Sequence, residues 1–330
     1  MEDITKEKLY EFWPAIFVLL VIVFIVFLSI YNFFIPRTIL PPGVNFEVKR
    51  GLTLREISEG LEKQGIINSA FSLRLFLLAQ QGKVQAGVYH FEGGLNTRDV
   101  AQILIHGGKE LALTFFEGMN LSQIQDALKV AGVEVDFSKQ NLKNYGQQFS
   151  FLRNFNNATS LEGFLFPDTY FFFKDVTTTD AISKFLINFQ RKALPLFLQS
   201  QSKDYYSDLI LASLLEEEIQ KKEDKTLVAD ILKRRLKIGM KLDVDATVVY
   251  VTKNPNVSKI DLQINSPYNT YRYRGLPPTP ISNPGIDSIE AALSPKANDF
   301  WYYLTDRQGG VYYAKTIEEQ LENKAKYLGK

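Results

Sequence analysis

Residues 208–220 read DLILASLLEEEIQ, an apolar run that ends in three consecutive glutamates. Apolar character over this length predicts a helix from about residue 207 to residue 220. At about 100° per residue, the apolar side chains gather on one side and Glu217 points almost directly away from them, toward solvent. Glu216 and Glu218 flank the apolar face instead. Either carboxyl group can therefore lie partly buried at the rim of a cleft.

A carboxyl group in that position suits acid catalysis. Desolvation disfavours its charged form, which raises its pKa and keeps it protonated as a general acid near neutral pH. Helical geometry does not choose between Glu216 and Glu218. On the pattern alone, three successive glutamates are more often the solvated end of a helix, because such side chains are seldom buried.

The composition of the 330-residue chain narrows the classes of function. The formal net charge is +1, from 38 basic and 37 acidic residues, so no charge excess favours binding to nucleic acid. The absence of cysteine excludes disulfides, thiol nucleophiles and thiolate metal sites. The only histidines, His90 and His106, are far along the chain from the glutamates, which argues against a histidine triad or a zinc site. We expect neither a metal nor a cofactor.

Residues 12–36 carry no charged side chain and are numerous enough to span a bilayer, so they predict a transmembrane helix. A cleaved signal peptide is the alternative, but its apolar core is usually only about 7–15 residues long. We expect residues 1–11 to form a short cytoplasmic tail and the proline-rich residues 37–45 to form a stiff linker. The basic residues on the two sides do not by themselves favour this orientation.

Three similar segments follow the linker. Each has a glycine turn and a short amphipathic helix, with the residues of a capping box at its start: Thr53 with Glu56, Asn96 with Asp99, and Asn120 with Gln123. A short predicted strand precedes each helix: VNFEVKR from residue 44, AGVYHFE from 86 and ALTFFEG from 112. Such units resemble LysM-type glycan-binding modules, and a spacer without a ligand fits the pattern equally well. We assign residues 46–135 to this αβ domain.

The remaining residues contain two further stretches that bear on chemistry. A second amphipathic helix is predicted over 224–239, with Gly239 as its stop. The next stretch, KLDVDATVVYV from residue 241, alternates polar and apolar residues, as a strand or an N-capping loop does. Its Asp243 and Asp245 could pair with a helix glutamate, as in a hydrolase with a separate acid and base.

A stretch rich in tyrosine, asparagine and proline follows over residues 266–285, SPYNTYRYRGLPPTPISNPG. Aromatic rings can stack on the apolar faces of sugars, and amide groups can bind sugar hydroxyls. A connection held by its prolines is the more ordinary explanation of this composition.

Several motifs occur in order along the chain: Leu161–Gly163, Phe166–Tyr170, Leu211–Ser213 with Glu216 and Glu218, Arg235–Met240, Leu242 with Asp245, Thr247, Val248 and Tyr250, Ser266–Tyr271, Gly275–Pro278, Pro280–Ile281 and Pro284–Gly285. Together they resemble the YceG-like, or MltG, family of endolytic murein transglycosylases. The chain departs from the family pattern at Glu217, Ile219, Ala246 and Gln320, where lysine, a small or hydroxyl residue, proline and histidine are usual.

The resemblance implies that Glu218 is the catalytic acid, with Glu216 as the alternative. We expect the substrate to be bound by a further set of residues: Ser213, Asp245, Thr247, Tyr250, Tyr268, Asn269 and Tyr271. The implied fold class is α+β, with a single N-terminal transmembrane helix, a LysM-like αβ domain and a lysozyme-like mixed α/β catalytic domain over 136–330.

We therefore expect a single-pass protein of the bacterial cytoplasmic membrane whose catalytic domain lies outside the cell membrane. The expected reaction cleaves nascent peptidoglycan glycan strands to 1,6-anhydro-N-acetylmuramic acid ends and so limits strand length. Penicillin-binding proteins and other wall-synthesis enzymes are candidate partners. Two alternatives stay open: a non-catalytic glycan-binding scaffold, and a hydrolytic muramidase that uses Asp245 as its second carboxylate.

Overall fold

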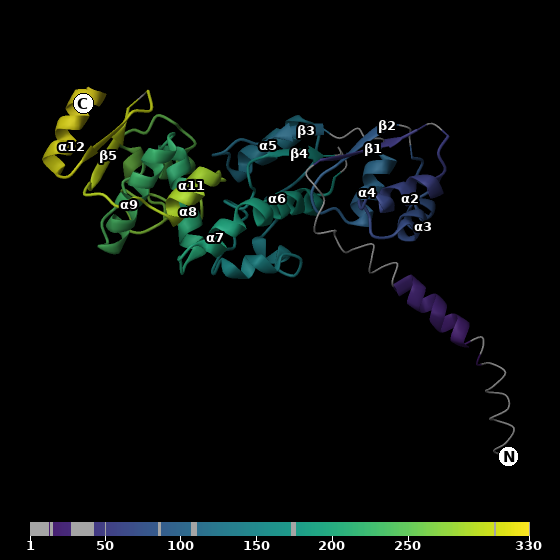
Figure 1. Cartoon of the computed structure of the whole chain (residues 1–330). Coiled ribbons are helices and arrows are strands. Elements are labelled where there is room, and N and C mark those ends of the chain that lie inside the picture. Colours follow the sequence, from purple (N-terminus) through teal and green to yellow (C-terminus); the bar gives the residue numbers. More distant parts are fainter. Residues whose placement is uncertain are drawn as a thin grey trace, which may run out of the picture. The chain divides into compact units, whose positions relative to one another are not determined.

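The computed structural model describes residues 13, 16–27, 43–49, 51–84, 87–106, 111–172, 176–306 and 308–329. The chain divides into two compact units, Met1–Glu110 and Leu111–Lys330 (Figure 1). Both units combine helices with short antiparallel strand pairs. The α+β class expected from the sequence is confirmed.

The expected transmembrane segment, residues 12–36, lies only partly within the described residues. Residues 16–27 form a helix whose apolar side chains are exposed. Most of the expected linker, residues 37–45, also lies outside the described part of the chain. Among the helices that the structure describes, none combines the length and the apolar character needed to cross a bilayer.

The first unit is built on two antiparallel strands with a pair of helices between them in sequence. Strand β1, Val44–Val48, pairs with β2, Gly87–Phe91. Helices α2, Leu54–Lys63, and α3, Ala70–Ala79, connect the two strands, and α4, Thr97–Ile105, follows them. The core of this unit is made of fully buried apolar side chains, including Leu61, Ile66, Leu73, Phe91 and Leu104.

The three predicted capping boxes are confirmed at the starts of α2, α4 and α5, Leu121–Val130. In each, the side chain of Thr53, Asn96 or Asn120 accepts the backbone N–H three residues on, and that residue's side chain accepts the cap's own N–H. These bonds satisfy backbone donors that have no partner inside the helix. The helix starts are therefore decided by local sequence.

The repeat pattern placed α5 in a domain that ended at residue 135, but the compact units divide before residue 111. Strand β3, Leu111–Thr114, pairs with β4, Thr169–Phe172, from much later in the chain. The buried residues of α5, Ile124 and Leu128, belong to the core of the second unit. The boundary is set by the long-range pairing of β3 with β4, which a repeat in the sequence cannot predict.

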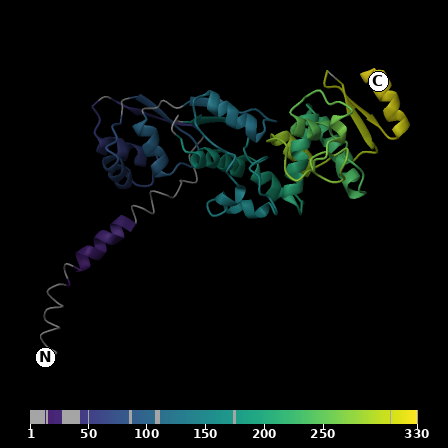
Figure 2. The ribbon, with the colours of Figure 1, turned by 180° about the vertical axis from the view of Figure 1, so that it is seen from behind.

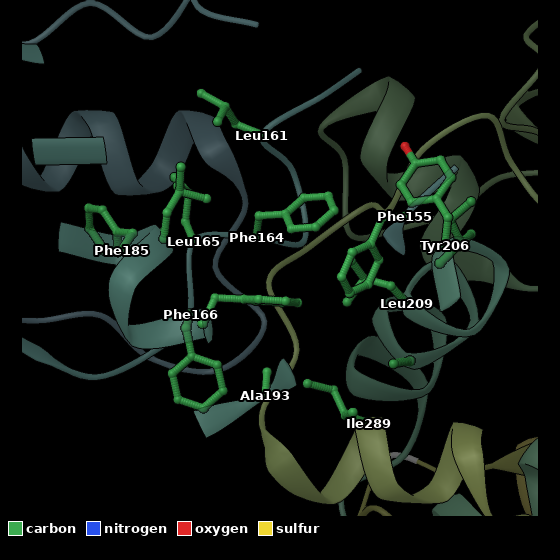
Figure 3. Packing of buried hydrophobic residues seen from close by; sticks show 14 of the residues in the cluster. Phe155, Leu161, Phe164, Leu165, Phe166, Phe185, Ala193, Tyr206, Leu209 and Ile289 are labelled. Atoms are coloured by element: carbon green, nitrogen blue, oxygen red, sulfur yellow. The ribbon is translucent and has the colours of Figure 1, made fainter. Parts of the chain in front are cut away.

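The second unit has an aromatic core beside α6, Thr178–Lys192, and α7, Leu194–Gln199. The ring centroid of Phe155 lies 5.1 Å from that of Phe164, edge to face, and Phe164 stacks on Tyr206 at 6.4 Å. Figure 3 shows these rings beside Leu209. Each fully buried phenylalanine stabilises the fold by roughly 1.5–3 kcal/mol, so this cluster anchors the helix on which Tyr206 and Leu209 lie.

That helix is α8, Tyr205–Glu218, and it confirms the helix predicted from the glutamate-rich stretch. It packs against α9, Lys222–Lys237, and both helices contact α11, Ile286–Leu293 (Figure 2). Every residue from Leu209 to Leu215 is buried. α8 is thus a core helix whose last turn, Glu216–Glu218, is partly or fully exposed.

The stretch from residue 241, expected as a strand or an N-capping loop, divides into two parts. Leu242 and Val244 are buried and alternate with exposed neighbours, as expected of an extended segment. From Asp245 to Thr252 the chain is helical, as α10. The alternation was therefore informative only up to the residue where α10 begins, because the β-branched residues that follow it are compatible with either structure.

The end of the chain forms a hairpin and a final helix. Strands β5, Tyr302–Thr305, and β6, Val311–Ala314, pair antiparallel. Helix α12, Ile317–Asn323, contacts both strands and continues into a π-helical turn, Lys324–Leu328. This hairpin contacts the C-terminal end of α8, where the hydroxyl of Thr305 donates to the carbonyl of Glu218 at 3.4 Å.

Candidate active site

The last turn of α8 carries three carboxyl groups at the negative end of a helix dipole, which is an unfavourable place for further negative charge. The structure resolves this by giving each glutamate a different environment. Glu217 is exposed, as its position on the helical wheel predicts. Glu216 and Glu218 instead turn toward the N-terminal ends of two other helices.

Glu216 belongs to a buried ion pair. Its Oε1 accepts from Lys225 Nζ at 2.8 Å, and the two side chains are only 8% and 5% exposed. Its Oε2 accepts the N–H of Gly285 at 2.9 Å, at the start of α11. The ammonium group and the positive end of α11 both favour the carboxylate. Both carboxylate oxygens of Glu216 are thus occupied by donors.

Glu218 meets no cationic side chain among the ion pairs of the described residues. Its Oε1 accepts the N–H of Ala246 at 3.0 Å, in the first turn of α10. Burial raises the pKa of Glu218 to about 7, the N–H of Ala246 opposes this, and the carboxylates of Asp245 and Glu217 add to it. The group can therefore hold or release a proton near neutral pH.

Asp245 and Tyr271, both expected at the site, lie together beside Glu218. The hydroxyl of Tyr271 donates to Asp245 Oδ1 at 2.5 Å. Burial, and then the Asp245 carboxylate, raise the pKa of Tyr271 far above its usual range, so the phenol keeps its proton. Asp245 is exposed, so one of its oxygens can still face a ligand or water.

Tyr250 and Tyr268, which were also expected at the site, lie side by side. Their ring centroids are 5.1 Å apart, and both side chains are partly exposed. The Tyr268 hydroxyl bonds to that of Thr279 at 2.8 Å, and the Tyr250 hydroxyl donates to Glu162 at 3.2 Å. The pair offers fixed aromatic surface of the kind on which a sugar ring can stack.

Three of the residues expected to bind substrate, Ser213, Thr247 and Asn269, are buried in the structure. Ser213 Oγ donates to the carbonyl of Ile210 at 2.7 Å and accepts the N–H of Ile281 at 3.1 Å. Such buried hydroxyl groups hold the fold together.

Thr247 and Asn269 act in the same way. Thr247 Oγ1 donates to the carbonyl of Val244 at 2.7 Å. The Asn269 amide donates to the carbonyls of Leu262 and Ile264 at 3.0 and 2.9 Å, so it organises the loop that carries Tyr268 and Tyr271. Its part in the site is to shape the loop.

Two residues of the site were missed as site residues. Glu162 is only 2% exposed, because the apolar residues around it in the chain are buried. It accepts the N–H of Leu121 at 2.9 Å and the amide of Asn283 at 3.1 Å, besides Tyr250. Burial raises its pKa to about 7. A glutamate within an otherwise apolar run, LEGFLF, was the available signal, since such a residue can hardly avoid burial.

The second site residue that sequence reasoning missed is Tyr303, on β5. Burial, followed by the charge of Glu218, raises its pKa well above the usual value. Its carbonyl accepts from the side chain of Gln320 at 2.9 Å, which ties α12 to this strand. Gln320 thus has a structural contact at the position where the family pattern has histidine.

Two hollows flank the end of α8. One, of about 530 Å³, is lined by Phe115, Phe116, Glu117, Pro167, Asp168, Glu216, Ile219 and Gln220. The other, of about 460 Å³, is called the Lys253 hollow below and is lined chiefly by Gly118, Asn120, Ser122, Gln123, Glu217, Ala246, Val249, Tyr250, Lys253, Pro255 and Ile281. Within the described residues, no group of His, Asp and Glu side chains is arranged to hold a metal ion.

Known proteins with similar sequences and folds identify the family. The YceG-like family model matches residues 46–326. An endolytic murein transglycosylase of Bacillus subtilis (strain 168) is 32% identical over 308 residues, which cover 86% of this chain and 85% of the relative. One from Streptococcus pneumoniae serotype 2 (strain D39) is 27% identical; the match covers 94% of this chain and 65% of that relative.

A crystal structure of a putative YceG-like protein from Listeria monocytogenes is also similar. Its TM-score is 0.52 at 28% identity, and the match covers 86% of this chain and 99% of that one. The family match spans most of both compact units and includes the whole of α8, α10 and α11. The chain belongs to the YceG-like family.

Proposed function

We propose that this protein is a lytic transglycosylase that cleaves the bond between N-acetylmuramic acid and N-acetylglucosamine in peptidoglycan, with Glu218 as its acid and base. The relatives named endolytic murein transglycosylase support the reaction class. The observation that carries the assignment to Glu218 is the contrast within α8. Glu216 is held in an ion pair with Lys225, whereas Glu218 is half-buried without an ion-pair partner among the described residues, and its desolvation raises its pKa to about 7.

The proposed reaction needs only one carboxyl group. Protonated Glu218 gives its proton to the glycosidic oxygen as that bond breaks, which leaves an oxocarbenium-like muramic acid ring. The resulting carboxylate then takes the proton of the same sugar's 6-hydroxyl as its oxygen attacks C1. A pKa near the working pH suits a group that must act first as acid and then as base. The product is a 1,6-anhydromuramyl end.

The surrounding residues have supporting roles in this proposal. The N–H of Ala246 fixes the direction of the Glu218 carboxyl group. The Asp245 carboxylate, held by Tyr271, helps to keep Glu218 protonated and is placed to interact with positive charge on the sugar ring. Tyr250 and Tyr268 supply the stacking surface.

A hydrolytic muramidase is the second candidate, because Asp245 is a second carboxylate close to Glu218. In that reaction Asp245 would activate a water molecule or attack the sugar directly. Mass spectrometry of the released ends distinguishes the two, since hydrolysis adds a water molecule and anhydro-ring formation does not.

The decisive variant is Glu218→Gln, which keeps the shape of the side chain and removes the transferable proton. Its release of anhydromuramyl ends from purified peptidoglycan should fall at least ~100-fold. Glu223→Gln, an exposed change on α9, is the matched control and should retain the parental rate. A Glu218→Gln protein that releases anhydromuramyl ends at the parental rate would refute the assignment.

We also propose that residues 12–36 anchor the chain in the bacterial cytoplasmic membrane with the second unit outside. The uncharged stretch supports this. Fractionation of cells, followed by protease treatment of intact spheroplasts, tests it: the second unit should be digested from outside. Protection of that unit would contradict the topology. Association with penicillin-binding proteins is part of the same proposal, and crosslinking in cells tests it.

The first unit is proposed as a LysM-like glycan-binding module. The order strand, helix, helix, strand in β1, α2, α3 and β2 supports this assignment. Residues 37–330 should sediment with purified sacculi more strongly than residues 111–330. Equal sedimentation of the two proteins would leave the first unit as a spacer.

A further inference from the structure

The Lys253 hollow has a mixture of groups that the proposed reaction does not use. It contains an ammonium group from Lys253, a carboxylate from Glu217, and amide or hydroxyl groups from Asn120, Ser122 and Gln123. Apolar surface comes from Val249, Pro255 and Ile281. An uncharged sugar needs rings and hydrogen-bonding groups, but it needs neither a cation nor an anion.

The hollow lies directly beside the candidate catalytic carboxyl. Ala246 is part of its wall, and the N–H of Ala246 is the group that binds Glu218 Oε1 at 3.0 Å. Only the first turn of α10 separates the hollow from Glu218. A ligand group bound in the hollow would therefore lie within about one helical turn of Glu218.

The cationic wall of the hollow is formed by Lys253. Lys253 ends α10 in the left-handed conformation, with φ +57°, and its ammonium group lies 4.4 Å from the centre of the Tyr250 ring. The Tyr250 hydroxyl is fixed in turn by the buried Glu162 at 3.2 Å. Within the described residues, Lys253 makes no ion pair, so its charge is available to a ligand.

The opposite wall is held as well. Gly118 has φ +83°, and a Cβ atom there would lie 2.9 Å from Glu217 Oε1. The missing side chain lets the Glu217 carboxylate pack against the backbone just before α5. The two charged side chains thus come from the C-terminal end of α8 and from the residue directly after α10.

We propose that the Lys253 hollow binds the short peptide carried by the muramic acid residue next to the cleaved bond, with Lys253 pairing with a peptide carboxylate. This inference rests on the proposed function, because it takes peptidoglycan as the substrate. In that polymer the sugars bear the peptides on alternate residues, and the peptides carry carboxylate, amide and small apolar groups. The hollow matches all three kinds of group.

The experiment compares two substrates on the full-length protein in detergent: uncrosslinked glycan strands with their peptides, and the same strands after an amidase has removed the peptides. The measured quantity is a ratio: kcat/KM on the strands with peptides divided by kcat/KM on the strands without them. Lys253→Gln should lower this ratio about tenfold, the worth of one partly exposed charged hydrogen bond. Lys253→Arg should restore most of it.

Lys259→Gln is the matched control, since Lys259 is exposed, carries the same charge and does not line the hollow. It should keep the parental ratio. Thermal unfolding of each variant confirms that it is folded.

The inference is overturned if Lys253→Gln leaves the ratio unchanged, whether or not overall activity falls. Equal losses on both strands would assign Lys253 to the sugar or to its lactyl carboxylate, which remains after the peptide is removed. Failure of the parent protein to cleave either strand is a different result, since it would refute the proposed function itself.

Discussion

Replacement of Glu216 by glutamine should destabilise the protein, although the two side chains have the same shape. The change removes the carboxylate and leaves the ammonium group of Lys225 without its partner. Lys225 is 5% exposed, so water cannot replace the lost ion pair. Breaking a buried pair from one side costs about 3–5 kcal/mol. The hydrogen bond from the Gly285 N–H adds little to this cost, because the glutamine oxygen can still accept it.

This cost can be translated into a melting temperature. In a compact unit of 150–250 residues, 1 kcal/mol shifts the midpoint by about 2–4 °C. Glu216→Gln should therefore lower the melting temperature of the second unit by on the order of 10 °C. The double variant Glu216→Gln with Lys225→Met removes both charges, and it should recover most of the loss.

Glu218→Gln is the internal comparison, two residues along the same helix. At pH 8 the parent must keep a desolvated carboxylate at this position, since burial raises the pKa of Glu218 to about 7. The glutamine variant lacks this penalty and should be at least as stable as the parent while it loses activity.

Thermal unfolding by circular dichroism and the release of anhydromuramyl ends, measured on the same protein samples, provide the assay. The expected pattern is a folded but inactive Glu218→Gln protein and a destabilised Glu216→Gln protein. A Glu216→Gln protein that melts within about 2 °C of the parent would refute a structural role for the ion pair. Greater instability of Glu218→Gln than of Glu216→Gln would reverse the two assignments.

Three further outcomes are expected. The kcat/KM of the parent should fall as pH rises through about 7, because only protonated Glu218 can act as the acid; a flat profile from pH 6 to 8 would contradict this. Between pH 4.5 and about 7, the Glu162 carboxyl keeps its proton in the folded protein but loses it in the unfolded chain. The free energy of unfolding should therefore fall as the pH rises through this window. In the Glu162→Gln variant, this loss of unfolding free energy, measured by urea unfolding, should be smaller by up to about 3 kcal/mol. Gly163→Ala, at φ +89° and with its Cβ 2.6 Å from Pro280, should cost at least about 2 kcal/mol more than Gly239→Ala, which has φ +66° and no such neighbour; equal midpoints in the same assay would contradict this.

Much of the local structure could be predicted because its causes lie within a few residues. The capping boxes at Thr53, Asn96 and Asn120 are formed by residues three positions apart, so the helix starts follow directly from the sequence. The apolar run before the glutamates predicted α8, and the helical wheel correctly predicted that Glu217 is exposed. The ordered motifs were sufficient to identify the family.

The extended region from residue 241 shows where local pattern was insufficient. Alternation was correct for Leu242 and Val244, but α10 begins at Asp245. Ser213, Thr247 and Asn269 carry the polar groups expected of a sugar site, yet all three are buried and bind backbone groups of the fold. The residue types showed which hydrogen bonds these side chains can make. Their burial determined which groups they bond to.

By itself, the sequence determined that two glutamates flank the apolar face of a helix, and family resemblance favoured Glu218. Only the tertiary structure gave the two groups different chemistry. Glu216 meets Lys225 and the start of α11, while Glu218 meets the start of α10 and Asp245. These partners come from distant parts of the chain. A pKa depends on the charges and the water around a group in space, so the position of a residue along a helix cannot set it.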